Sequence, residues 1–465
     1  MAPGRVGAVP QQGFINGAGE GGTPPYPRPA VAWQILITLF LATVVSYMDR
    51  GIIALLIPDL KATFHLSDTK VSIVQGLAFS AFFALASIPV GHLVDRINRR
   101  NIIICGILFW SAATMACGLA RNYPELLLAR ACVGIGEASL IPAAYSIVAD
   151  CFTAARRGRA MSLLVAAASL GGALSNLVGG LLLKMVSGST HVMVPVLGDI
   201  VVWRFVFLVF GSFGALLVVL LLAFREPARR LSQAAGPDAP AKAKFFAYAR
   251  RDPYLYGATF MIVSLIFTTT TVTSLWIVVA LARVHHVGIA DAGMMIGFAK
   301  LASHVVGSLA GGVVGDLLAR SRLSYGRLNL WFFGMPLLAL GGAMLVWPGT
   351  LVAFILGFWI IGVVGAAAAG ASYPIIYDIV PADLRGQSIA YCMTISNLVS
   401  FGLGPTLPAL LNDRVFGDEA MIHYSLMIVT AGSAVLAGVL AVSIRGRFER
   451  ARLALESGQQ SAPDA

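Results

Sequence analysis

The sequence predicts an all-α membrane protein in which twelve transmembrane helices form two pseudo-symmetric six-helix halves. Composition is the first reason: of 465 residues, 58% are apolar and 12% are charged, whereas soluble domains carry about 25% charged residues. The second reason is a succession of apolar segments close to the roughly 20 residues that a membrane-spanning helix needs. The third is a set of motifs that occurs once in each half of the chain.

The apolar segments define the expected spans in chain order. They cover 33–57, 71–94, 101–121, 124–150, 160–187, 203–224, 254–284, 290–318, 328–347, 349–377, 386–411 and 421–444.

The longest connection between these segments divides the chain. Residues 226–252 carry Ala, Pro, Gly and basic residues without hydrophobic periodicity, which is typical of a flexible cytoplasmic linker. We therefore expect six-helix halves at 31–225 and 253–445. Residues 1–30 are rich in Gly and Pro and lack the apolar core of a signal peptide, so they are expected to be a disordered cytoplasmic tail. Residues 446–465 are expected to be a second cytoplasmic tail.

The basic residues are distributed unequally between the two sides of the expected spans. Of 33 Lys and Arg, 23 fall on the side that carries both termini, seven on the opposite side and three within spans. This is the positive-inside asymmetry, and it predicts a multi-pass protein of the plasma (inner) membrane with both termini in the cytoplasm. Topology thus accounts for the net charge of +11, and we expect membrane lipids but no nucleic acid as partners.

Several classes of chemistry have no motif in this chain. The five cysteines are odd in number and form no CxxC, so they are expected to be small buried hydrophobic residues and not metal ligands or disulfides. A P-loop, an HExxH and a GxSxG are all missing. We therefore expect neither an enzyme nor an ATP-driven pump, and no cofactor.

The two halves share motifs at the cytoplasmic ends of their spans. Residues 145–150 (YSIVAD) match residues 373–378 (YPIIYD) at a shift of 228, and Arg157-Gly158 falls on Arg385-Gly386 at the same shift. Residues 91–95 (GHLVD) match residues 312–316 (GVVGD) at a shift of 221. Duplicated halves around a central path are the architecture of secondary transporters.

The loop after the second span continues from Gly91 through Asp95 and Arg96 to Arg99 and Arg100. This GxxxDRxxRR run resembles the signature loop of the major facilitator superfamily, and the resemblance implies the major facilitator fold. We expect a gate here that is locked in the outward-open state and broken on switching. Its expected residues are Gly91, Asp95, Arg96, Arg100, Asp150, Asp316 and Arg385. The alternative is ordinary positive-inside anchoring by the basic residues.

Four charged residues lie inside expected spans of the first half: Asp49 and Arg50 in span one, Arg130 and Glu137 in span four. A charge at bilayer depth costs at least ~2.5 kcal/mol, so such residues usually have a function or a partner. If Pro58 and Pro124 mark the outer ends of these spans, Asp49 and Arg50 lie at a depth between Arg130 and Glu137.

These four residues suggest a proton switch. Burial favours the neutral form of a carboxylic acid, whereas a nearby cation favours its charged form. Our hypothesis is that Asp49 and Glu137 bind and release protons while Arg50 and Arg130 set their proton affinity. The alternative is a static structural ion pair.

The same positions carry a narrower resemblance. Residues 130–139 (RACVGIGEAS), the run Ala149-Asp150-Cys151-Phe152 and residues 47–50 (YMDR) look like spinster-type transporters. The resemblance covers most of the first half. It implies a lysophospholipid- or sphingosine 1-phosphate-like substrate and a coupling role for Asp49, Arg50, Arg130 and Glu137. Residues 140–142 (LIP) depart from the small hydroxylated residues more usual there, which puts the substrate in doubt.

The second half contributes polar positions of its own. Lys300 and His304 are four residues apart and share one face of the eighth span, where they can meet a phosphate or carboxylate. Thr270, Tyr373 and Asn397 are further substrate-binding candidates. The alternatives are that Lys300 extends toward the interface and that the hydroxyl groups bond within their own helices.

Taken together, the sequence predicts a monomeric secondary active transporter that works by alternating access. Its expected cargo is a lysophospholipid- or sphingolipid-like amphiphile, moved with protons. The alternative is a proton-linked transporter of a small organic anion, sugar acid or drug. A receptor on the same scaffold would bind ligand without moving it.

Overall fold

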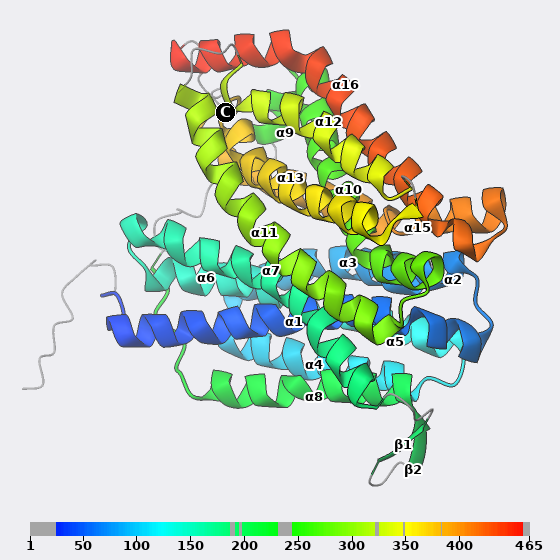
Figure 1. The fold of residues 1–465 in the computed structure, drawn as a ribbon. Coiled ribbons are helices and arrows are strands. Elements are labelled where there is room, and N and C mark those ends of the chain that lie inside the picture. The colour runs from blue at the N-terminus through cyan, green and yellow to red at the C-terminus, as the bar shows by residue number, and fades with distance from the viewer. Residues whose placement is uncertain are drawn as a thin grey trace, which may run out of the picture.

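The computed structural model describes residues 25–186, 191–194, 198–230, 244–320, 325–346, 349–382 and 384–458. It is built almost entirely of helices that form two bundles (Figure 1). The bundles lie close together on the right of the view and diverge toward the left, where α1 begins and the chain ends. Most of the expected N-terminal tail and the central part of the expected linker lie outside the described residues.

Among the described residues, the first half contains eight α-helices, one π-helical segment and one hairpin. They are α1 (Pro29–Phe64), α2 (Asp68–Ser72), the π-helical segment η1 (Ile73–Leu77), α3 (Ala78–Arg96), α4 (Arg99–Leu119), α5 (Tyr123–Glu137), α6 (Leu140–Cys151), α7 (Ala154–Met185), β1 (His191–Val194), β2 (Gly198–Val201) and α8 (Val202–Leu222).

The second half follows the linker. It comprises α9 (Lys244–Ala249), α10 (Pro253–His285), α11 (Ile289–Arg320), η2 (Gly326–Leu328), α12 (Asn329–Met344), α13 (Leu351–Tyr377), α14 (Arg385–Asn397), η4 (Leu398–Leu403), α15 (Thr406–Leu411), η5 (Asn412–Phe416), η6 (Glu419–Met421) and α16 (Ile422–Glu456).

The multi-pass helical architecture is confirmed. Among the described residues, eleven helical segments are long and apolar enough to cross a membrane. At the expected ninth span lies α12, which has 16 residues and is shorter than the others. The count of twelve therefore remains a prediction, although every expected span has a helix at its place.

Several boundaries differ from those expected. α1 continues past Pro58 to Phe64, so Pro58 does not mark the end of the first span; a proline removes one backbone donor but need not end a helix whose flanks are packed. The fourth span is interrupted at Ala138 and Ser139, between α5 and α6. α16 extends to Glu456, into the segment expected to be a tail. β1 and β2 pair as an antiparallel hairpin that hydropathy does not predict.

Short polar residues define where many helices start. Ser67, Asn98, Asn122, Asp252 and Thr350 each accept a hydrogen bond from the backbone N–H three residues on. Such caps satisfy one of the unpaired donors in the first turn of a helix. The starts of these helices are therefore set by the local sequence. The expected spans three, four, seven and ten accordingly begin close to four of these caps.

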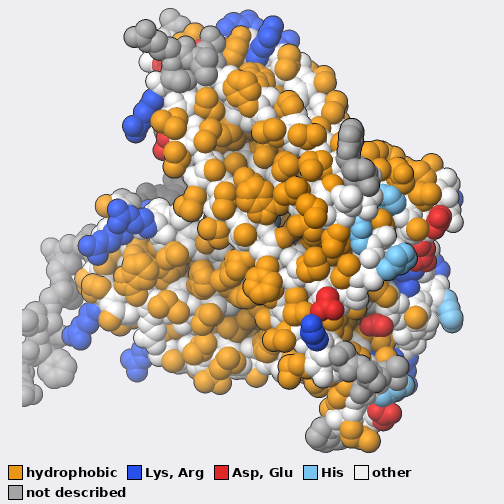
Figure 2. Space-filling view, viewed as in Figure 1, with side chains coloured by type: hydrophobic (Ala, Val, Ile, Leu, Met, Phe, Trp, Pro, Cys, Tyr) orange, Lys and Arg blue, Asp and Glu red, His pale blue; other side chains and the backbone are white. Residues whose placement is uncertain are grey.

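Buried apolar residues of the two halves join in one core cluster, and the halves meet mainly where α7 lies along α11. Figure 2 shows a surface dominated by hydrophobic side chains, with Lys and Arg gathered toward the end that carries the chain termini. Leu85, Ile88, Leu309 and Val313 are among the large apolar residues that are more than 60% exposed. Such a surface suits contact with lipid.

Candidate functional site

A buried charge cluster, made of Asp49, Arg50, Arg130 and Glu137, lies inside the first half. Glu137 is 0% exposed, and its Oε2 accepts a hydrogen bond from Arg50 Nε at 2.5 Å and one from the Ser46 hydroxyl at 2.7 Å. This ion pair joins the helices of spans one and four. Glu137 Oε1 has no hydrogen-bond partner among the described residues.

The other carboxylate of the cluster bonds to a different helix. Asp49 Oδ2 accepts a hydrogen bond from the Thr114 hydroxyl of α4 at 2.6 Å, whereas Asp49 Oδ1 is buried without a described partner. Arg130 is 0% exposed, and all three of its guanidinium nitrogens lack a hydrogen bond to any described residue.

Aromatic rings surround the Arg50 guanidinium. Its central carbon lies 4.5 Å from the centre of the Tyr47 ring, 4.8 Å from that of Phe79 and 5.1 Å from that of Phe83. Cation–π contacts stabilise a guanidinium most where water is excluded. These contacts hold Arg50 beside Glu137, and the Arg50 guanidinium keeps N–H donors that form no hydrogen bond with a described residue.

Glycines position Glu137, the last residue of α5. A Cβ added to Gly134 would lie 2.4 Å from the Phe79 carbonyl oxygen of α3, and one added to Gly136 would lie 2.8 Å from Trp110 of α4. This glycine pair therefore lets α5 pack closely against α3 and α4. The interruption after Glu137 lies directly beside the cluster; helix breaks of this kind often occur at functional sites.

Chemically, the cluster balances two carboxylates against two guanidiniums but leaves hydrogen-bonding capacity unused. Asp49, Glu137 and Arg130 each keep buried polar atoms without a described partner. Buried polar atoms normally find partners, and exceptions call for a functional explanation. A carboxyl oxygen in this position can take up a proton, and Arg130 can accept a new partner when charges rearrange.

Lys300 and His304 lie on α11 of the second half, and both are half-buried. His304 Nδ1 lies 3.0 Å from the Lys300 carbonyl oxygen, which confirms that the two residues share one face. Lys300 Nζ forms no hydrogen bond or ion pair with any residue that the structure describes. It rests against α7 of the first half, 3.1 Å from where a Cβ on Gly172 would be.

The other substrate-binding candidates have different surroundings. The Thr270 hydroxyl donates to the Phe267 carbonyl of its own helix at 3.0 Å, which agrees with the alternative that such hydroxyl groups bond within their own helices. Tyr373 is half-buried. Asn397 is exposed at the end of α14. The structure thus does not gather these three around Lys300.

An ion-pair network, centred on Asp68, joins the two halves at the end opposite the chain termini. Asp68 is fully buried and bonds to Lys61 of the first half. From the second half, Arg283 donates to both Asp68 oxygens at 2.7 and 2.8 Å, and Asn412 donates at 2.8 Å. Glu419 pairs with Lys61 at 2.8 Å and with Arg283 at 3.0 Å.

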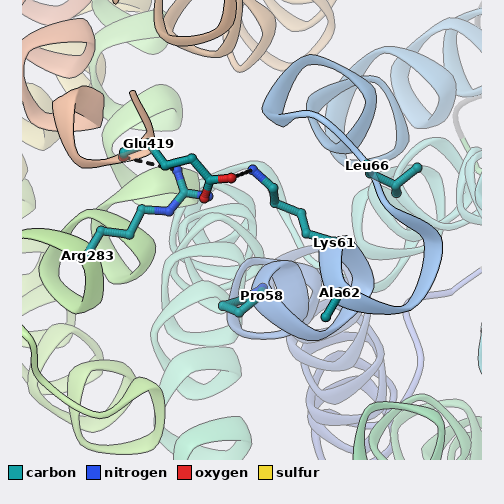
Figure 3. A pocket seen from close by; sticks show the side chains of 6 residues that line it. All are labelled: Pro58, Lys61, Ala62, Leu66, Arg283 and Glu419. Carbon is teal, nitrogen blue, oxygen red and sulfur yellow. Dashed lines mark hydrogen bonds and ion pairs between the residues drawn. The ribbon is translucent and has the colours of Figure 1, made fainter. Parts of the chain in front are cut away.

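Figure 3 shows Lys61 and Arg283 reaching Glu419 from opposite sides of a pocket of about 440 Å³. Nearby, Asp413 of the second half accepts hydrogen bonds from the backbone N–H groups of Asp68 and Thr69 at 3.3 and 2.7 Å. A carboxylate at the first turn of a helix is stabilised by the unpaired N–H groups there. One half therefore caps a helix of the other, and we call this region the closed end.

At the opposite end the expected gate residues stay within their own halves. A Cβ added to Gly91 or Gly312 would meet no other heavy atom within 4 Å, so no helix approaches either glycine in this structure. Asp95 and Arg96 are exposed. We call this region the open end; in Figure 2 the outline is indented there, between the halves.

Arg99 organises the open end of the first half. It pairs with Asp150 at 2.5 Å and with Glu226, in the segment after α8, at 2.6 Å. Arg100 donates to the Phe224 carbonyl at 2.7 Å, and Arg229 donates to the carbonyls of Val94, Asp95 and Ile97 at the end of α3. The segment 226–230 thus ties the ends of α3, α4 and α6 together; we call it the strap.

The second half has a related arrangement, in which no strap is seen among the described residues. Arg327 pairs with Asp378 at 3.2 Å and with Asp316 at 3.4 Å. Arg385 donates to the carbonyls of Tyr377 at 3.0 Å and Val380 at 3.2 Å, at the end of α13. Asp150, Asp316 and Arg385 therefore hold helix ends within a half in this structure.

Sequence reasoning did not single out several residues that make these contacts. They are Ser46 and Thr114 in the charge cluster, Arg327 at the open end, and Lys61, Asp68, Arg283, Asn412, Asp413 and Glu419 at the closed end. Arg99 was named in the basic run after the second span but not among the expected gate residues. One signal was present: Arg99 and Arg327 are related by the same shift of 228 that relates Asp150 to Asp378. The closed-end residues carry no shared motif.

All five cysteines are free, and among the described residues no cluster of His, Cys, Asp or Glu is arranged to hold a metal ion.

Comparison with known proteins places this geometry in a wider group. The Major Facilitator Superfamily profile matches residues 39–405. The chain is 36% identical to protein spinster homolog 1 of Xenopus laevis over 199 residues, which are 42% of this chain and 35% of that protein. It is 25% identical to an MFS-type efflux pump of Mycolicibacterium smegmatis over 417 residues, 87% of this chain and 90% of that protein. The spinster match thus spans about a third of that relative's length.

A solved structure has the same fold. It is a bacterial homologue of the human lysosomal transporter Spinster in an inward-facing, unoccupied conformation, with a TM-score of 0.73 and 22% identity. The alignment covers 94% of this chain and all of that one.

Proposed function

The chain belongs to the Major Facilitator Superfamily, and on that premise we propose that it is a proton-coupled secondary active transporter of a lysophospholipid- or sphingolipid-like amphiphile. The observation that carries the proposal is the contrast between the closed end and the open end. In the part of the chain that the structure describes, ion pairs around the buried Asp68 join two similar halves at one end and none joins them at the other, which suits a path that opens alternately to each side.

The buried charge cluster supports the proton-coupled part of the proposal. Glu137 and Asp49 each have one oxygen bonded and one without a described partner. Protonation of Glu137 would weaken its pair with Arg50, and the freed guanidinium and Arg130 would then compete for the remaining carboxylate. We propose that this exchange of partners accompanies the change from one open end to the other.

Topology completes the proposal. The open end carries the chain termini and most of the basic residues, so we assign it to the cytoplasmic side of the plasma (inner) membrane. Each chain holds its own path between its two halves, and we therefore propose that it acts as a monomer.

The test begins with the lipids that copurify with the protein, identified by mass spectrometry. Uptake of a fluorescent lysophosphatidate is then measured in proteoliposomes with and without a pH gradient. We expect uptake that rises with the gradient, and uptake by Glu137→Gln and Asp49→Asn that no longer responds to it. Wild-type gradient dependence in both variants would exclude the assigned proton role, and binding without flux would indicate a receptor.

The second candidate function is proton-linked transport of a small organic anion, sugar acid or drug. It is favoured by the similarity to the MFS-type efflux pump, which extends over 87% of this chain. Gluconate and a cationic dye in the same flux assay distinguish it, because a lipid carrier should move neither.

A further inference from the structure

One charged residue of the membrane interior lacks a counterion in the described structure. Lys300 lies 11 residues into α11, about 16 Å from its first residue, which is farther than a lysine side chain reaches. Extension to the membrane surface therefore does not account for it. An ionisable residue at this depth usually pairs with another group or marks a substrate pathway.

Lys300 lies where the two halves begin to separate. Toward the closed end, glycines hold α11 against the first half: a Cβ on Gly293 would lie 3.2 Å from the Asn176 carbonyl, and one on Gly297 would lie 2.9 Å from the Leu177 nitrogen. Toward the open end, Gly307 packs instead on Val363 of α13, within its own half. Lys300 falls between these two regions of α11, where the helix changes from packing on the first half to packing within its own half.

His304 extends this site by one helical turn. Its Nδ1 is used by the Lys300 carbonyl, so its Nε2 remains for a ligand. Lys300 Nζ and His304 Nε2 are not among the fully enclosed polar atoms. Two nitrogens on one face, with no carboxylate bonded to either, suit a phosphate or carboxylate group.

A chain of contacts connects this site with the charge cluster. Lys300 lies against Gly172, and the adjacent Gly171 packs on α1, where an added Cβ would lie 2.8 Å from the Tyr47 Cβ. The Tyr47 ring lies against Arg50, and Arg50 pairs with Glu137. A ligand that draws Lys300 away from α7 therefore acts on a surface that is contiguous with the proton-handling residues.

We propose that Lys300 and His304 bind the negatively charged group of the transported molecule, so that this protein selects its cargo by negative charge. The inference rests on the proposed transport function and deepens it. Lys300 has no counterion among the described residues, and an anionic head group supplies one. A zwitterionic amphiphile with the same tail brings its own cation to the site and gains less.

The test compares two single-chain phospholipids with the same acyl chain, lysophosphatidate and lysophosphatidylcholine, together with gluconate as a small anion. Affinity is measured on the full-length protein in detergent by tryptophan fluorescence. We expect the anionic lipid to bind about tenfold or more tightly than the zwitterionic one, because hydrogen bonds to charged groups are the stronger kind. Lys300→Met should remove this preference, His304→Gln should weaken it, and Lys300→Arg should keep it.

Lys184→Met is the matched control. Lys184 also joins α7 to α11, through an exposed pair with Asp291 at 2.8 Å, and its loss should leave the preference unchanged. Elution volume and melting temperature confirm that each variant is folded.

The outcomes separate the two proposals. Equal binding of both lipids, or a preference that survives in Lys300→Met, would overturn the anion site while leaving transport in place. Lys300-dependent binding of gluconate alone would support the anion site and overturn the lipid cargo. No binding of any of the three would contradict both.

Discussion

The two halves hold the same residues at the open end but in different environments. In the first half, Arg99 and Asp150 are 1% and 4% exposed and lie 2.5 Å apart, sealed by Glu226 of the strap. In the second half, Arg327 and Asp378 are 29% and 23% exposed and lie 3.2 Å apart. The duplicated Arg–Asp pair is therefore buried in the first half and partly exposed to solvent in the second.

The two halves also differ in the charged residues that lie inside the membrane. The first half contains two carboxylates and two arginines that largely balance one another. Among the described residues of the second half, Lys300 has no counterion. The two halves thus share one helical arrangement but carry different buried charges. This difference suits a division in which the first half handles protons and the second half binds the ligand.

The comparison predicts its largest effect on stability at the open end. Arg99→Met removes the cation that pairs with Asp150 and Glu226, and breaking a buried pair by removing one partner costs about 3–5 kcal/mol. Arg327→Met should cost about 1 kcal/mol or less, because exposed pairs contribute little. Thermal unfolding of both variants in detergent measures the difference, and equal losses would show that the strap does not enclose the first pair.

A second prediction uses two adjacent glycines of α7 that face different halves. Gly171→Ala places a Cβ 2.4 Å from the Val44 carbonyl oxygen, and such overpacking costs about 1–3 kcal/mol. Gly172→Ala meets only the flexible end of Lys300, at 3.1 Å, so its cost should stay within about 0.5 kcal/mol. Melting temperatures of the two variants test this; a larger loss for Gly172→Ala would mean that Lys300 is held rigidly.

A third prediction separates contacts between the halves from contacts within them. Asp68→Asn removes the carboxylate shared by Lys61 and Arg283 and should loosen the closed end. We expect a cysteine placed at Leu66 to react with an impermeant maleimide about tenfold faster, which corresponds to a loss of about 1.4 kcal/mol. Asp291→Asn, at the exposed pair with Lys184, is the control and should change the rate little.

Features that depend on residues close together in the sequence were predictable, whereas contacts between distant segments were not. Hydropathy located the spans, and the spacing of Asp49, Arg50 and Glu137 brought the right helices together. The partner of Asp49 was not predictable, because the face that α4 turns toward α1 is set by packing and places Thr114 there. The ion pairs of the closed end were not predictable either, because Asp68, Arg283 and Glu419 come from separate segments and meet only in this conformation.

The smallest predicted effect concerns Asp378, at the end of α13 outside the spans. Burial raises the pKa of this carboxyl above its ordinary value of 3.8, although Arg327 acts in the opposite direction. The folded state therefore binds the proton more tightly than the unfolded state, and the stability from this group is lost as the pH rises through the raised pKa. Relative to Asp378→Asn, the wild type should gain about 1 kcal/mol or less as the pH falls from about 7 to about 4.

Melting temperatures over this pH range check the sign. If the wild type instead lost stability relative to Asp378→Asn on acidification, the pair with Arg327 would outweigh burial, and the two halves would be alike at this position.

The central claim is that the carboxylates of the first half carry protons while the second half holds the cargo. It is tested most directly by recording the internal pH of weakly buffered proteoliposomes as lysophosphatidate is added outside. The account predicts a pH change with wild type and with Lys184→Met, and lysophosphatidate movement without a pH change in Glu137→Gln. An undiminished pH change in Glu137→Gln would contradict it.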